Sequence, residues 1–172
     1  LMWFRGRNIT RETVAFFHIG EIESQKYGKI IVFPYVNKET GVVEFYKYRP
    51  LNDKSAMFTS KNSAPCLFGW QSARDVKSIV ICEGEIDAMS YAQAGICALS
   101  VPRGGGDKGK QDPWIEYEWE HLQCIENIYL SLDMDAPGQA AKEYIANRLG
   151  TYRCFDVVLP RKDANECLQY GI

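Results

Sequence analysis

Five acidic residues follow the ends of three apolar runs in this sequence. They are Glu83 and Asp87 after the run 78–82, Asp133 and Asp135 after the run 127–132, and Asp163 after the run 155–160. Carboxylates packed closely together repel one another, so some would stay protonated unless a cation neutralised them. Magnesium prefers oxygen ligands, and two such ions about 4 Å apart form the clamp used by polymerases and nucleases. The pattern therefore predicts a site for two divalent ions, Mg²⁺ or Mn²⁺.

The apolar runs are typical of strands in a parallel sheet, because they are continuous rather than alternating. The expected strands are 78–82, 96–101, 127–132 and 155–160, and the expected helices are 85–95, 138–150 and 164–171. Strands that alternate with helices predict an α/β fold, with a mainly parallel sheet flanked by helices. The carboxyl ends of parallel strands meet at one edge of the sheet, so this fold would bring the acidic residues together.

Residues 1–75 have a different pattern from residues 76–172, and we expect two domains with this boundary. The runs 29–36 and 42–51 flank a short polar turn, which predicts a β-hairpin. A short helix is predicted before the hairpin. The first part is therefore expected to be a smaller α+β subdomain, and the second part the larger α/β domain.

Two basic residues are expected on one face of the second hairpin strand. Lys47 and Arg49 alternate with Tyr46 and Tyr48 in the run "YKYR", so each pair shares a face. The basic face is suited to a nucleic-acid backbone or a nucleoside triphosphate. A solvated strand face with no ligand is the alternative interpretation.

The glycine-rich segment after the second parallel strand resembles a phosphate-binding P-loop only in part. Gly104, Gly109 and Lys110 fit that pattern, but Gln111 lacks the hydroxyl that a P-loop uses to hold magnesium. Pro113 also delays the start of the next helix. We therefore expect a loop without ATPase function. It would bring three basic residues to the active-site side for template or phosphate: Arg103, Lys108 and Lys110.

Some of the acidic residues have a structural alternative. Asp163 and Glu166 form a D-x-x-E capping box, in which Asp163 caps the last helix. Asp135 precedes Ala-Pro-Gly and is also placed to start a helix, while Glu83 and Glu85 are candidates for solvated turn residues. Caps and turns do not readily explain acidic residues at the ends of three different strands.

Bulk composition excludes few classes of protein. The formal net charge of −2 indicates no overall basic field, so nucleic acid would have to bind in a local groove. Six cysteines without a C-x-x-C pair, and only two histidines, do not favour a structural zinc site. No apolar run approaches the ~20 residues of a membrane span, so no membrane contact is expected. The chain begins without Met, and we expect it to be a piece of a larger protein.

Three segments resemble the TOPRIM domain of bacterial-type primases, topoisomerases and some nucleases: "VICEGEIDAMS", "LSLDMDAPGQAAKEYIANRLG" and "LPRKDANECL". Three earlier segments are similar to the region before TOPRIM in phage-type primase-helicases and the related Twinkle helicase: "FRGRNITRETVAFFHIG", "IVFPYVNKETGVVEFYKYRPL" and "LFGW". The resemblance covers nearly the whole chain. It implies a TOPRIM domain over 76–172 and a primase subdomain over 1–75.

The resemblance also implies roles for single residues. Asp133 and Asp135 would hold magnesium, Glu83 would bind a metal or assist proton transfer from the attacking 3′ hydroxyl, and Asp87 and Asp163 would complete the site. The implied activity is DNA primase, a DNA-directed RNA polymerase. Its partners would be a single-stranded DNA template, ribonucleoside triphosphates and a replicative helicase domain in cis or in trans.

The resemblance implies the cytoplasm of a bacterial or phage-infected cell and leaves an organellar origin open. Two alternative functions remain at this point. A TOPRIM nuclease would share the acidic site, but such nucleases lack the N-terminal hairpin region. A DNA-binding module without catalysis is the other alternative, although the intact acidic set does not favour a lost activity.

Overall fold

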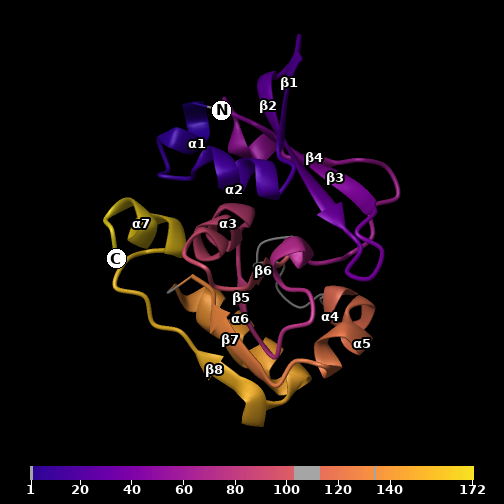
Figure 1. Cartoon of the computed structure of the whole chain (residues 1–172), viewed down its shortest axis with the longest axis vertical. Helices are drawn as coiled ribbons and strands as arrows, with labels where there is room; N and C mark the ends of the chain where they lie inside the picture. The colour runs from indigo at the N-terminus through magenta and orange to yellow at the C-terminus, as the bar shows by residue number, and fades with distance from the viewer. Residues whose placement is uncertain (1, 103–112, 134) are drawn as a thin grey trace.

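Two four-stranded sheets form the framework of the chain, an antiparallel one built from the N-terminal region and a parallel one built from the C-terminal region (Figure 1). The computed structural model describes residues 2–102, 113–133 and 135–172. Helices flank the parallel sheet, and the antiparallel sheet contains the predicted hairpin. The predicted α/β fold class is therefore confirmed.

The N-terminal region contains two short helices and the antiparallel sheet, which has the strand order β1-β2-β3-β4. Its elements are α1 (Met2–Arg5), α2 (Arg11–Phe16), β1 (Gly20–Ser24), β2 (Gly28–Val36), β3 (Val43–Pro50), the 3-10 turn η1 (Lys54–Ala56) and β4 (Phe58–Thr59). Thr10 caps α2 by accepting a hydrogen bond from the Thr13 N–H at 3.2 Å. The predicted hairpin is β2 and β3, and two edge strands extend it.

The C-terminal region alternates strands and helices, and its four strands are all parallel in the order β6-β5-β7-β8. Its elements are η2 (Trp70–Ser72), β5 (Ser78–Cys82), α3 (Glu85–Gln93), β6 (Ala98–Ser100), α4 (Pro113–Tyr117), α5 (Trp119–Gln123), β7 (Asn127–Ser131), α6 (Ala136–Leu149), η3 (Thr151–Arg153), β8 (Cys154–Asp156) and α7 (Ala164–Gln169). The last strand is shorter than the predicted 155–160, because it is an edge strand paired only with β7.

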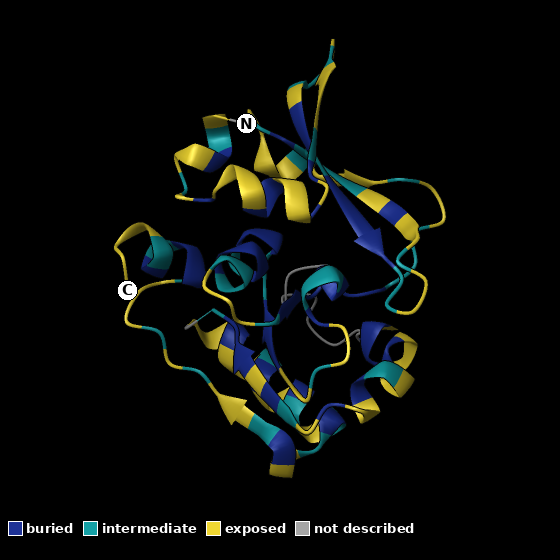
Figure 2. Cartoon of the chain, viewed as in Figure 1, coloured by how far each residue is buried: buried dark blue, intermediate teal, exposed yellow. Residues whose placement is uncertain are grey.

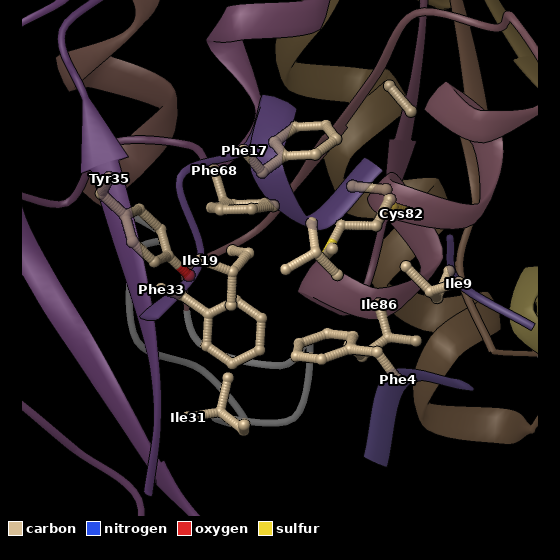
Figure 3. Close-up of a cluster of buried hydrophobic side chains, with 14 of the residues drawn as sticks. Phe4, Ile9, Phe17, Ile19, Ile31, Phe33, Tyr35, Phe68, Cys82 and Ile86 are labelled. Atoms are coloured by element: carbon tan, nitrogen blue, oxygen red, sulfur yellow. The ribbon is translucent and has the colours of Figure 1, made fainter. Parts of the chain in front are cut away.

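Alternate residues of β5 face different hydrophobic clusters, so the parallel sheet is covered on both faces. Val80 and Cys82 pack in a cluster with residues of α3, whereas Ile79 and Ile81 pack in a second cluster with residues of α4, α5 and α6. The first cluster also contains side chains of α1, α2 and β2, and Figure 3 shows how they meet around Cys82. The two regions therefore share one continuous core.

Buried residues concentrate where the antiparallel sheet and α3 meet, while the tip of the β1–β2 hairpin projects into solvent (Figure 2). This shared core fixes the position of β3 relative to the carboxyl end of β5. In the described part of the chain, no helix is long and apolar enough to cross a membrane.

Candidate active site

Two of the predicted acidic residues lie side by side at the carboxyl edge of the parallel sheet. The strands β5 and β7 end in register, with Cys82 opposite Ser131. Glu83 follows directly, and Asp133 comes two residues after Ser131. The Asp133 N–H donates to Glu83 Oε2 at 3.4 Å, so the two loops are in contact.

The helices α3 and α7 bring two further carboxylates to this edge. Asp87 lies in the first turn of α3, and Asp163 is the N-cap of α7, where its side chain accepts from the Glu166 N–H at 2.8 Å. The Asn165 N–H donates to Asp87 Oδ1 at 3.1 Å, which holds the start of α7 against α3. The capping interpretation of Asp163 therefore describes its structure, and the same residue also lines the acidic cleft.

Crowding of negative charge changes the acidity of this group. Burial, followed by the charge of Asp163, raises the pKa of Asp87 to about 7, although the Asn165 N–H opposes the change. The pKa of Asp133 is also raised, first by burial and then by Asp135, while Lys162 opposes the increase. A bound cation would relieve this repulsion, which makes the donor set suited to a divalent ion.

Asp135 lies close to this group but has a different position. It is exposed and is the N-cap of α6, accepting from the Gly138 N–H at 2.9 Å. A Cβ atom at position 138 would collide with the backbone carbonyl of Asp133. The close approach of the α6 N-terminus to Asp133 therefore requires glycine at this position.

The acidic residues form one wall of a cleft of about 400 Å³, and basic residues of the N-terminal region form the other. Its charged lining consists of Arg7, Lys47, Arg49, Lys54, Glu83, Glu85, Asp87, Asp133, Lys162, Asp163 and Glu166. Lys54 and Lys162 lower the pKa of Asp133, so their positive charge acts on the carboxylates. Such a cleft can place a polyanion against a group of metal-binding carboxylates.

Lys47 is tied to the carboxylate edge by a buried ion pair that the sequence analysis missed. Its ammonium binds Glu85 Oε1 at 2.5 Å and donates to the Pro102 carbonyl at 3.1 Å. The Tyr35 hydroxyl donates to the same Glu85 oxygen at 2.5 Å. Opposing the effect of burial, the Lys47 charge and these hydrogen bonds lower the pKa of Glu85. Glu85, interpreted above as a possible turn residue, is instead the first residue of α3 and connects this helix to the antiparallel sheet.

Arg49 and Arg7 both contact the indole ring of Trp3. Their guanidinium carbons lie 4.9 Å and 4.0 Å from the ring centroid, distances typical of cation–π contacts. Burial and the nearby Arg7 charge lower the pKa of Arg49. Lys47 and Arg49 thus share a face of β3 and line the cleft, as their spacing predicts.

The remaining predicted residues, Arg103, Lys108 and Lys110, lie outside the described residues. Among the residues that the structure does describe, no three His, Cys, Asp or Glu side chains are arranged as a preformed metal cage. That finding is compatible with magnesium, which typically uses one or two carboxylates and completes its shell with water and substrate phosphates.

Comparison with known proteins identifies the fold of this site. Residues 80–168 match the family model described as "Toprim-like", which includes every acidic residue of the cleft. The chain belongs to the Toprim-like family. Its matched segment begins within β5 and ends in α7, so the acidic edge is the part that the family shares.

Relatives extend the similarity to the N-terminal region of this Toprim-like chain. A "Twinkle homolog protein, chloroplastic/mitochondrial" of Arabidopsis thaliana is 30% identical over 96% of the chain, and a "DNA helicase/primase" of Enterobacteria phage T3 is 30% identical over 94%. The chain spans about a quarter of the length of these relatives, 25% and 28% respectively. The resemblance to phage-type primase-helicases and Twinkle proteins is thus confirmed.

Among solved structures, the primase fragment of the Bacteriophage T7 primase-helicase protein superimposes with a TM-score of 0.81. It is 26% identical to this chain, and the match covers 97% of this chain and 69% of the fragment. The arrangement of both sheets, including the hairpin that carries Lys47 and Arg49, is therefore that of a primase fragment.

Proposed function

We propose that this chain is the catalytic core of a DNA primase, which copies single-stranded DNA into short RNA in a metal-dependent reaction. The observation that carries the proposal is the cleft itself, in which carboxylates of the Toprim-like sheet face basic residues of the N-terminal sheet. The Lys47–Glu85 ion pair joins these two walls. The overall match to a phage primase fragment supports the same reaction.

In this proposal, Asp133 and Asp135 hold magnesium, and Glu83, Asp87 and Asp163 complete the acidic site. Bound Mg²⁺ or Mn²⁺ would neutralise a triphosphate and stabilise the attacking and leaving oxygens. Glu83 binds metal or accepts the proton of the attacking 3′ hydroxyl. Burial and the neighbouring carboxylates disfavour ionisation of Asp87, and a cation beside it would favour the carboxylate form.

The basic wall positions the anionic reactants in this proposal. Lys47 and Arg49 bind triphosphate or template backbone, and Arg103, Lys108 and Lys110 contact template or phosphate. Holding the reacting groups in line and neutralising their charge supplies most of the catalysis. The partners are a single-stranded DNA template, ribonucleoside triphosphates and a helicase domain in cis or in trans.

One gel tests this function against its alternatives. The chain is incubated with an end-labelled single-stranded oligonucleotide, labelled ribonucleotides and Mg²⁺ or Mn²⁺, beside Asp133→Asn and the control Glu126→Gln. Glu126 is exposed and lies at the opposite, amino end of β7. New short RNA that is lost only in Asp133→Asn is the expected result. A shortened oligonucleotide would indicate a nuclease. No product at all would indicate either a binding module that has lost the activity or dependence on a zinc-binding module, and adding that module would separate the two.

A further inference from the structure

Four aromatic rings form a row on the face of the N-terminal sheet that points away from the cleft. Tyr46 and Tyr48 lie on this face of β3, because the intervening residues point into the cleft. Phe58 of β4 is directly opposite Tyr48, with ring centroids 4.8 Å apart. Tyr46 lies 6.4 Å from Tyr48, and Tyr27 lies 5.7 Å from Phe58.

The rings are accessible to solvent although large rings usually contribute to cores. Tyr46 and Phe58 are each 40% exposed, and Tyr27 and Tyr48 are partly exposed. On the inner face of the same sheet, Phe33 is fully buried. A contiguous row of exposed rings, unlike single exposed apolar residues, is typical of a binding surface.

Two lysines lie near the row. The Lys26 ammonium lies 4.8 Å from the centroid of the Tyr27 ring, and the exposed Lys61 follows β4 directly after Ser60. Ser60 is hydrogen-bonded to the backbone of Tyr46, which keeps this loop beside the row. Exposed rings with lysines nearby favour a nucleic acid over an apolar protein partner, because lysines contact phosphates while bases stack on rings.

The row is continuous with the proposed active site. Lys54 and Met57 line the cleft, and Phe58, which lies between Tyr48 and Tyr27 in the row, follows Met57 directly. The row therefore adjoins the rim of the cleft at Phe58.

We propose that Tyr27, Tyr46, Tyr48 and Phe58 form a stacking platform for unpaired bases of single-stranded DNA that extends out of the cleft. The proposal rests on the proposed function, because the strand would be the template that the cleft copies. Stacking on aromatic rings tolerates any base, since every base presents a π face. Such a platform would hold template outside the cleft without selecting its sequence.

The chain offers a matched control for this surface. Tyr129 and Phe155 stack on the parallel sheet at 5.4 Å and are 39% and 43% exposed. Phe155 is followed by the acidic Asp156, and neither ring lines the cleft. Leucine at such positions keeps an apolar side chain but removes the ring, so the same double substitution tests both surfaces equally.

The test measures fluorescence anisotropy of labelled single-stranded DNA without metal or nucleotides, at one fixed salt concentration. A probe of about 4 nucleotides is expected to occupy the cleft alone, and a probe of about 16 nucleotides the cleft and the platform together. For Tyr46→Leu/Phe58→Leu we expect affinity for the long probe to fall at least about 10-fold. Affinity for the short probe should be unchanged, as should both affinities of Tyr129→Leu/Phe155→Leu.

The platform would be overturned if the folded Tyr46→Leu/Phe58→Leu variant bound the long probe as tightly as wild type does, or if it lost affinity equally for the long and the short probe. It would also be overturned if the variant lost as much affinity for an abasic long probe as for the normal one. Wild-type protein that binds neither probe would also overturn it. If circular dichroism shows that the double variant is unfolded, Tyr46→Leu alone replaces it, with a loss of about 5-fold expected. RNA synthesis is assayed separately, so a binding platform without synthesis would refute only the proposed function.

Discussion

The Glu85 carboxylate of α3 binds the Lys47 ammonium of β3 at 2.5 Å, which joins the C-terminal region to the antiparallel sheet. Both side chains are nearly buried, with 7% and 12% of their surface exposed. A buried ion pair adds little net stability compared with an apolar pair, but loss of one partner leaves an uncompensated charge. This pair therefore fixes how the basic wall of the cleft faces the acidic wall.

Glu85→Gln is expected to destabilise the chain by about 3 kcal/mol, because it leaves the Lys47 ammonium buried without its counter-ion. The double variant Glu85→Gln/Lys47→Met should recover most of that loss. Urea unfolding of the single and double variants measures both effects. A change below about 0.5 kcal/mol in Glu85→Gln would contradict the buried ion pair.

The ion pair also has a defined pH dependence. Burial raises the pKa of Glu85, but the Lys47 charge and the hydrogen bonds from Lys47 and Tyr35 together lower it below its ordinary value of 4.5. The contribution of the pair to stability is therefore fully present above about pH 4.5 and is lost as the pH falls through the lowered pKa. Wild type and Glu85→Gln should accordingly converge in stability in acid.

Asp87 gives the opposite pH dependence in metal-free protein. Its pKa rises from 3.8 in the unfolded chain to about 7 in the folded chain, so the folded state favours the protonated form. The Asp87 contribution thus reduces stability as the pH rises from about 4 to about 7. In EDTA at pH 8, the free energy of unfolding of Asp87→Asn should exceed that of wild type by an amount on the order of 2 to 4 kcal/mol.

Below about pH 3 the difference between wild type and Asp87→Asn should disappear, because Asp87 is then protonated in both the folded and the unfolded chain. Thermal unfolding at a series of pH values measures this difference. Mg²⁺ should reduce the difference at pH 8, since an ion bound to the carboxylates of the folded state stabilises that state. A difference that does not change with pH would contradict the crowded acidic site.

Gly138→Ala separates helix propensity from the geometry of the site. Propensity alone predicts a gain of up to about 1 kcal/mol for alanine in α6. The new Cβ atom, however, would collide with the Asp133 carbonyl. We expect Gly138→Ala to be less stable than wild type and to synthesise RNA at least about 10-fold more slowly, because a displaced catalytic group is no longer aligned with the reactants. The control Ala140→Gly, in the same helix, should lose about 1 kcal/mol and retain synthesis.

The sequence was sufficient to predict the acidic edge, because strand ends in a parallel sheet meet regardless of which helices cover them. Glu83 and Asp133 come together for that reason. Glu85 was not predicted, since it lies in α3 while its partners Lys47 and Tyr35 lie on the antiparallel sheet, and the pairing depends on how the helix packs against that sheet. No local spacing rule contains that information.

The local sequence pattern also did not predict the edge strands of the antiparallel sheet. β1 carries three exposed residues in a row, and β4 is only two residues long, so neither has the apolar signal of a strand. Lys54 and Lys162 likewise lie in polar segments with no periodicity. They reach the cleft through the turn η1 and through the segment before the Asp163 cap.

The most direct test of the central claim is extension of a short RNA primer already annealed to a DNA template, which removes any need for template selection. With Mg²⁺ or Mn²⁺ and ribonucleotides, the chain is expected to extend the RNA, and Asp133→Asn should slow extension at least about 100-fold. Glu126→Gln should extend at the wild-type rate. Absence of extension by the wild-type chain, or equal rates for wild type and Asp133→Asn, would contradict a catalytic role for the acidic cleft.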